Sequence, residues 1–107
     1  MIKILIIEDD VTIVKNLSEL LRQEGFETDS ALSCKEAETK IETAQFDLVL
    51  LDVLLPDGNG FSLCNRIKSV SDCPVIFLTA SADEFSVVTG LDIGADDYIE
   101  KPYRPRE

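Results

Sequence analysis

The sequence contains no histidine and only three cysteines among its 107 residues. The cysteines, Cys34, Cys64 and Cys73, do not have the spacing of metal ligands, and no histidine is present to complete a set. These two shortages argue against a zinc centre. We therefore expect three free thiols, as in a protein of the reducing cytosol.

Basic residues are also scarce, with 10 lysines and arginines against 21 aspartates and glutamates, for a net charge of −11. A domain this acidic is poorly suited to bind the phosphates of nucleic acid or an anionic membrane, so any DNA contact would need another domain of a longer chain. No apolar run approaches the length of a membrane span, and the N-terminus has no signal-peptide pattern. We expect a soluble protein of the cytoplasm.

Nearly continuous apolar runs alternate with stretches of helical period. The runs predict five strands, at residues 2–7, 26–32, 47–53, 74–78 and 98–99. Apolar residues at three- and four-residue steps predict four helices between them, starting near Val11, Cys34, Phe61 and Phe85. This alternation predicts an α/β fold, in which a five-stranded parallel sheet is doubly wound with helices on both faces.

The pattern favours one domain over residues 1–107, with no internal repeat or linker. After the fifth predicted strand only residues 103–107 remain, so a fifth helix is largely missing. We expect the chain to be the front part of a longer protein. Where that helix should lie beside the first one, we expect an apolar patch that favours pairing with another chain.

Asp52 lies within the apolar run LVLLDVLLPDG, where an unpaired carboxylate is costly. Because the carboxyl ends of parallel strands meet at one edge of a sheet, Asp52 should have polar neighbours from other strand ends. These neighbours are Glu8, Asp9, Asp10, Thr79 and Lys101. Clustered carboxylates need a cation, and oxygen ligands suit Mg²⁺, while a hydroxyl and a lysine suit an anion. The set predicts phosphoryl transfer with Asp52 as the nucleophile, forming an aspartyl phosphate.

Four motifs occur in the chain, namely Glu8-Asp9-Asp10, Asp52 with Leu55-Pro56-Asp57-Gly58, Thr79-Ala80 and Lys101-Pro102. In this order and at these spacings, the chain resembles the receiver domain of two-component response regulators over essentially its whole length. The resemblance implies the CheY-like strand order 2-1-3-4-5 and a sensor histidine kinase as the partner that phosphorylates Asp52.

The same resemblance implies roles for the other matched residues. Asp9 would bind Mg²⁺ directly, Glu8 through water, and Leu54 through its backbone carbonyl, beside Asp52. Thr79, Ala80 and Lys101 would surround the phosphoryl group, and Tyr98 would act with Thr79 as the switch. Asp10 is better explained as an acid of the first helical turn, and Asp57 as a turn residue.

Residues 90–107 resemble the OmpR/PhoB subfamily. That likeness implies a C-terminal winged-helix DNA-binding domain that controls transcription, and a homodimer through the fourth helix, fifth strand and fifth helix. Val87, Asp96 and Asp97 would lie at this interface. The predicted fourth helix carries Asp83 and Glu84 where the subfamily has basic residues, so we expect a more apolar contact or no contact at all. Because the fifth helix is missing, two chains could instead exchange elements.

Three other functions are alternatives to a phosphorylated receiver that controls a DNA-binding domain. A stand-alone receiver would act by protein contact alone, and a pseudo-receiver would work without phosphorylation, although the complete polar set argues against the second. A metal-dependent phosphatase with an aspartate nucleophile would need a second acid two residues beyond Asp52, where Leu54 stands. We expect self-phosphorylation and autodephosphorylation only, with no external substrate.

Overall fold

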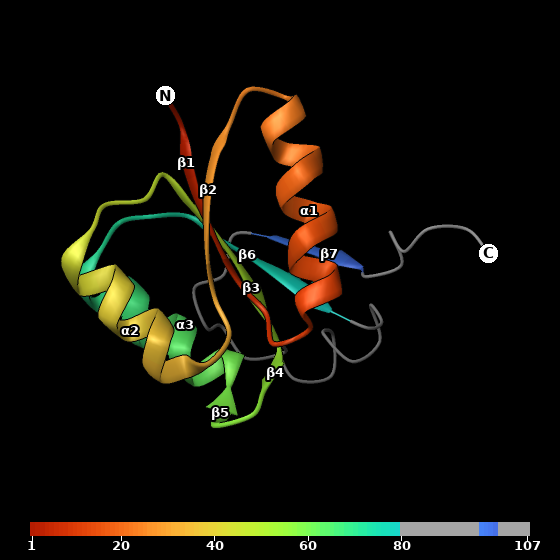
Figure 1. Cartoon of the computed structure of the whole chain (residues 1–107). Coiled ribbons are helices and arrows are strands. Elements are labelled where there is room, and N and C mark those ends of the chain that lie inside the picture. The colour runs from red at the N-terminus through yellow and green to blue at the C-terminus, as the bar shows by residue number, and fades with distance from the viewer. Residues whose placement is uncertain (80–96, 101–107) are drawn as a thin grey trace.

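The computed structural model describes residues 1–79 and 97–100. Their main feature is a parallel sheet with helices on both faces (Figure 1). Its strands are β1 (Lys3–Ile7), β2 (Glu27–Ala31), β3 (Leu48–Asp52), β6 (Val75–Thr79) and β7 (Asp97–Glu100). The helices described are α1 (Val11–Gln23), α2 (Cys34–Thr43) and α3 (Gly60–Val70). Two short strands, β4 (Leu54–Leu55) and β5 (Gly58–Asn59), form a separate antiparallel pair.

The order of the five-stranded sheet is β2-β1-β3-β6-β7, and every neighbouring pair is parallel. This order confirms the predicted doubly wound α/β fold with strand order 2-1-3-4-5. The predicted fourth helix, near Phe85, lies outside the described residues. Among the helices that the structure does describe, none is long and apolar enough to cross a membrane.

The sheet is buried on both faces, which explains why its strands are almost continuously apolar. Successive side chains of a strand point to opposite faces. In β1, Leu5 and Ile7 pack in the core under α2 and α3, whereas Ile4 and Ile6 pack with α1 on the other face. Figure 1 shows α1 alone on its side and the α2–α3 pair on the opposite side. β3 lies in the middle of the sheet, and its residues pack on both faces, Val49 and Leu51 with α2 and α3 and Leu50 on the α1 side.

The α1 face also carries an open apolar hollow of about 580 Å³. It is lined by apolar side chains of α1 and of the sheet, including Leu17, Leu21, Leu48 and Ile76. Leu20, at its margin, is 53% exposed. This is the face on which the sequence predicts an apolar patch beside the first helix.

The connection from β3 to α3 differs from the expected plain loop. Leu54 pairs with Asn59 and Leu55 with Gly58, so the chain makes a small hairpin whose tip is Pro56-Asp57. The sequence predicted a turn at this tip but not the pairing, because two-residue strands leave no periodic signal. The hairpin places the chain just beyond Asp52 in a defined position.

Candidate functional site

Asp52 is the last residue of β3, at the C-terminal edge of the sheet. Its neighbours in the sheet are β1 on one side and β6 on the other, where Asp52 is paired with Leu78. The residue is only 6% exposed, and the two residues before it, Leu50 and Leu51, belong to the core. The apolar run therefore fixes the position of one carboxylate at the edge of a buried strand.

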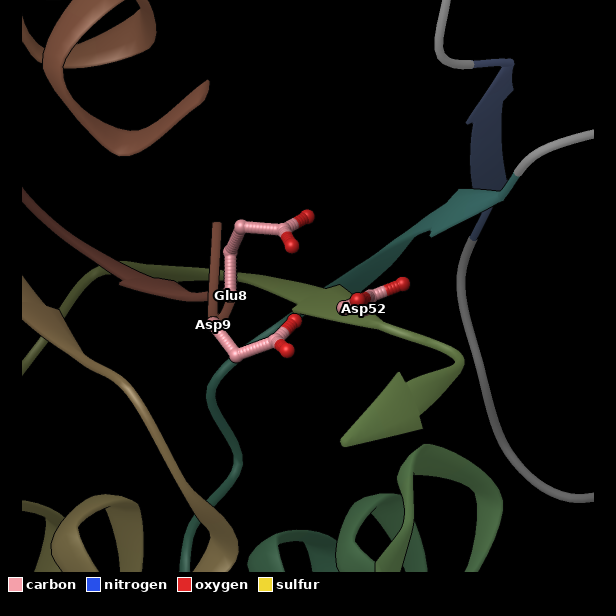
Figure 2. Close-up of side chains that lie close together, drawn as sticks. All are labelled: Glu8, Asp9 and Asp52. Carbon is pink, nitrogen blue, oxygen red and sulfur yellow. The ribbon is translucent and has the colours of Figure 1, made fainter. Parts of the chain in front are cut away.

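Glu8 and Asp9 follow the end of β1 at the same edge of the sheet. Glu8 is 1% exposed, whereas Asp9 is exposed. One carboxylate oxygen from each of Glu8, Asp9 and Asp52 lies within 4.8 Å of the others. Figure 2 shows these three side chains gathered where β1 and β3 end. We call this set the acidic cluster; the structure brings it together as the sequence predicts.

The start of α1 orients Glu8. The backbone N–H of Asp10 donates to Glu8 Oε2 at 3.1 Å. Asp10 is itself the N-cap of α1, since its Oδ1 accepts from the N–H groups of Thr12 at 3.0 Å and Ile13 at 3.4 Å. The sequence predicted Asp10 to lie in the first turn of this helix, and the structure places it one position earlier, at the N-cap. Asp10 thus connects the start of α1 to Glu8 of the acidic cluster.

The acidic cluster fits a hard divalent cation. The three charges repel one another at this separation, and a cation between them turns repulsion into attraction. In an octahedral site, Mg²⁺–oxygen distances of about 2.1 Å place ligand oxygens at most about 4.2 Å apart. Small side-chain rotations would bring the three carboxylates to that spacing, directly or with a water in between.

Other predicted site residues are located by the backbone. Thr79 ends β6 and is paired with Glu100, the last residue of β7, at the same edge as Asp52. In β7, Tyr98 is paired with Phe77 and Asp97 with Ile76. Leu54 begins β4, two residues beyond Asp52. The remaining predicted residues lie outside the described ranges, namely Ala80, Val87, Asp96 and Lys101.

Gly60 is a site residue that sequence reasoning missed. It is the first residue of α3, and its N–H donates to the carbonyl of Val53 at 2.7 Å. A Cβ at this position would overlap the backbone carbonyl oxygen of Asp52. Only glycine allows α3 to begin this close to the strand end, because it has no side chain. The sequence showed a glycine-rich loop here, but no local signal indicated what the glycine touches.

Asp57 is the second residue whose role was missed, since the sequence indicated a turn residue only. Its Oδ1 accepts from the N–H of Cys34 at 2.7 Å, and its Oδ2 from the N–H of Lys35 at 3.1 Å. These two bonds lower the pKa of the Asp57 carboxyl, the Cys34 bond contributing most. Burial and, next, the negative charge of Asp57 raise the pKa of the Cys34 thiol. Cys34 is thus a buried thiol, as are Cys64 and Cys73.

The lowered pKa of Asp57 gives a pH-dependent contribution to stability. Above the usual carboxyl pKa of 3.8, Asp57 is ionised in both the folded and the unfolded protein, and its full contribution to the free energy of unfolding is present. This stabilising contribution is lost as the pH falls through the lower pKa that Asp57 has in the folded protein. We expect Asp57→Asn to flatten this part of the pH dependence, measured as the urea midpoint at a series of pH values. Parallel curves for the two proteins would contradict this assignment of the shift.

Comparison with known proteins places this geometry in a family. The family model of the response regulator receiver domain matches residues 4–107. The DNA-binding response regulator MtrA of Mycobacterium tuberculosis is 42% identical over 105 residues, which cover 98% of this chain and 46% of that protein. The chain therefore spans about half the length of the curated relatives it matches.

Solved structures agree with the family match. TrrA of Thermotoga maritima, solved in complex with Mg²⁺ and BeF, has a TM-score of 0.87 and 32% identity, with 97% of this chain and 90% of that chain covered. DrrB of the same organism, an OmpR/PhoB homologue, has a TM-score of 0.85 and 38% identity, with 96% of this chain and 46% of that chain covered. The chain belongs to the response regulator receiver domain family of two-component signalling.

Proposed function

We propose that Asp52 is the phosphoacceptor of this receiver domain and takes its phosphoryl group from the phosphohistidine of a sensor histidine kinase. The observation that carries the proposal is the convergence of Glu8 and Asp9 on Asp52, within 4.8 Å, at the edge of a buried central strand. A structural carboxylate would not need two further acids beside it. A phosphoacceptor that works with a cation would.

The acidic cluster and one backbone carbonyl form the proposed metal site. Asp9, Asp52 and the carbonyl of Leu54 would bind Mg²⁺ directly, and Glu8 would contact a water bound to the ion. When bound, Mg²⁺ supplies the positive charge that offsets the repulsion between the Asp52 carboxylate and the phosphoryl oxygens. The hydrogen bond from Asp10 holds Glu8 in place for this role.

In the transfer step, one carboxylate oxygen of Asp52 forms a bond to phosphorus while the bond to the donor nitrogen breaks. Burial of Asp52 limits its rotation, so its oxygen is held in the attacking position. The hydroxyl of Thr79 binds a phosphoryl oxygen, as do Ala80 and Lys101, which lie outside the described residues. Nothing in this proposal requires an external substrate.

Signalling then depends on Thr79 and Tyr98. The pairing of β6 with β7 places Thr79 opposite Glu100 and Phe77 opposite Tyr98, so the two switch residues lie on neighbouring strands. We propose that phosphorylation turns Thr79 toward Asp52 and Tyr98 inward, which changes the surface around β7. The output proposed is a DNA-binding domain of a longer protein, since the similar protein MtrA is named as a DNA-binding response regulator. The resemblance to the OmpR/PhoB subfamily implies that this domain is a winged helix and that the protein acts in the cytoplasm. A homodimer through this surface would involve Val87, Asp96 and Asp97.

A stand-alone receiver remains the second candidate. Its support is that several similar solved chains, such as TrrA, are only slightly longer than this one. Such a protein would act by contact of the switched surface with a partner protein. The chemistry proposed for Asp52 is the same in both cases.

The proposal is tested by incubating the domain with acetyl phosphate and measuring its intact mass. With Mg²⁺ we expect a gain of one phosphoryl group, and with excess chelator we expect none. The modified aspartate is then located by reduction with borohydride and peptide mass analysis. Failure to gain a phosphoryl group in Mg²⁺, in a protein whose circular dichroism shows it to be folded, would contradict the proposal.

A further inference from the structure

The segment from Val53 to Gly60 forms a closed unit directly after the proposed phosphoacceptor. At its base, the carbonyl of Val53 accepts the N–H of Gly60 at 2.7 Å. Above the base, Leu54–Leu55 pair with Gly58–Asn59, and the tip is Pro56-Asp57. Because the base is hydrogen-bonded and the two short strands are paired, a displacement of the tip would also displace Leu54.

The tip is fastened to the start of α2, more than 20 residues earlier in the chain. Both carboxylate oxygens of Asp57 are used, one by the N–H of Cys34 at 2.7 Å and one by the N–H of Lys35 at 3.1 Å. Bonds from backbone N–H groups to a carboxylate are charge-assisted, and the positive end of the helix dipole strengthens them.

The next residue shows how closely the tip lies on α2. A Cβ added to Gly58 would be 3.1 Å from the Sγ atom of Cys34, tighter than ordinary contact. Cys34 is buried and belongs to the core beneath α2 and α3. The hairpin tip thus rests on a fixed part of the molecule rather than on a mobile side chain.

Other groups cap the rest of the α2 terminus. Ser33 Oγ accepts from the N–H of Glu36 at 3.2 Å, and Glu36 Oε1 accepts from the N–H of Leu32 at 2.9 Å. Capping of this helix end is therefore shared, and Ser33 contributes to it as the N-cap residue directly before α2. Asp57 differs from these groups because it joins the helix to the hairpin that carries Leu54.

We propose that Asp57 is a positioning residue for the magnesium site. By fastening the hairpin tip to α2, it holds the backbone carbonyl of Leu54 in place as a metal ligand. The inference rests on the proposed function, in which that carbonyl binds Mg²⁺. Asp57 itself would not touch the ion, and its effect would act through Leu55 and Pro56, the two residues that connect it to Leu54.

The test is the affinity for Mg²⁺ alone, measured by isothermal titration calorimetry on the wild type and four variants, Asp57→Ala, Asp57→Asn, Ser33→Ala and Asp9→Asn. We expect Asp57→Ala to weaken Mg²⁺ binding about 10-fold, as loss of a group that orients a metal ligand commonly does. Asp57→Asn should weaken it only about threefold, because the amide oxygen still accepts one N–H. The matched control is Ser33→Ala, which removes a cap from the same helix without touching the hairpin. It should lower the urea midpoint and leave Mg²⁺ affinity unchanged.

Two results would overturn the inference. One is a wild-type Mg²⁺ affinity in Asp57→Ala, and the other is an equal loss of affinity in Ser33→Ala, which would make Asp57 only a helix cap. Asp57→Asn keeps the test valid if the alanine variant does not fold. Failure of the proposed function gives a different pattern, in which the wild type binds no Mg²⁺ or Asp9→Asn binds it as well as the wild type.

Discussion

Replacing Asp52 by asparagine is expected to abolish the gain of a phosphoryl group from acetyl phosphate in the presence of Mg²⁺. The amide has nearly the shape of the carboxylate but lacks its charge and its nucleophilic oxygen. The uncharged amide would also be a poorer ligand for a divalent cation. The loss should therefore be complete within the sensitivity of intact-mass measurement, whereas the fold should persist.

The stability of this variant gives a second readout. Asparagine keeps nearly the shape of the buried Asp52 side chain and differs mainly in charge. We expect Asp52→Asn to unfold in urea in a single cooperative transition, as the wild type does. A variant without that transition would show that phosphorylation is lost because the domain is unfolded.

The matched control for this experiment is Asp72→Asn. Asp72 is an exposed acid in the segment between α3 and β6, at the opposite end of β6 from Thr79. The same chemical change there should leave the phosphoryl gain at the wild-type level. If Asp52→Asn is phosphorylated as well as this control, another acid is the acceptor and the assignment of Asp52 is wrong.

Replacing Gly60 by alanine is expected to destabilise the domain by about 1–3 kcal/mol, as overpacking of a close-packed site does. The new Cβ would overlap the carbonyl oxygen of Asp52 and would approach the Cα of Val53 to 3.1 Å. Both neighbours are backbone atoms, so relief requires movement of the chain rather than rotation of a side chain. That movement would displace Asp52, and we expect phosphorylation to be slowed as well.

Helix propensity alone predicts that Gly60→Ala stabilises the domain. Gly60 is the first residue of α3, and alanine is favoured over glycine within a helix by about 1 kcal/mol. A urea-unfolding measurement therefore decides between the local preference and the close approach. Ser62→Ala provides the control, because it introduces alanine at an exposed position of the same helix and should change stability by less than about 0.5 kcal/mol. A Gly60→Ala variant as stable as the wild type would show that the backbone near Asp52 yields at little cost.

The fold could be predicted from the sequence because its signals are local. Alternating apolar runs and helical periods predicted the five strands of the main sheet and the three described helices in their order, and the parallel arrangement followed from that alternation. The end of α1 is an example. Gly25 follows the last turn of α1, where glycine commonly ends a helix, and it has a φ of +95° and donates its N–H to the carbonyl of Arg22.

Much of the candidate site could be predicted for a related reason. Asp52, Glu8 and Asp9 each stand at a strand end, and the carboxyl ends of parallel strands share one edge. Fold topology thus converts positions far apart in the sequence into neighbours in space. The resemblance to receiver domains supplied the roles of these residues, and the roles remain predictions for the experiments above.

The sequence by itself determined the strands of the main sheet, the three described helices, their order and the identity of the acids at the strand ends, since each depends on patterns within a few residues. Only the tertiary structure decided how the chain beyond Asp52 is held. The residues that donate hydrogen bonds to Asp57 lie 22 and 23 positions earlier in the chain. The atom that excludes a side chain at Gly60 is the backbone carbonyl oxygen of Asp52, at the end of β3. Local sequence periodicity predicts neither contact, because each arises only when α2, β3 and α3 are packed together.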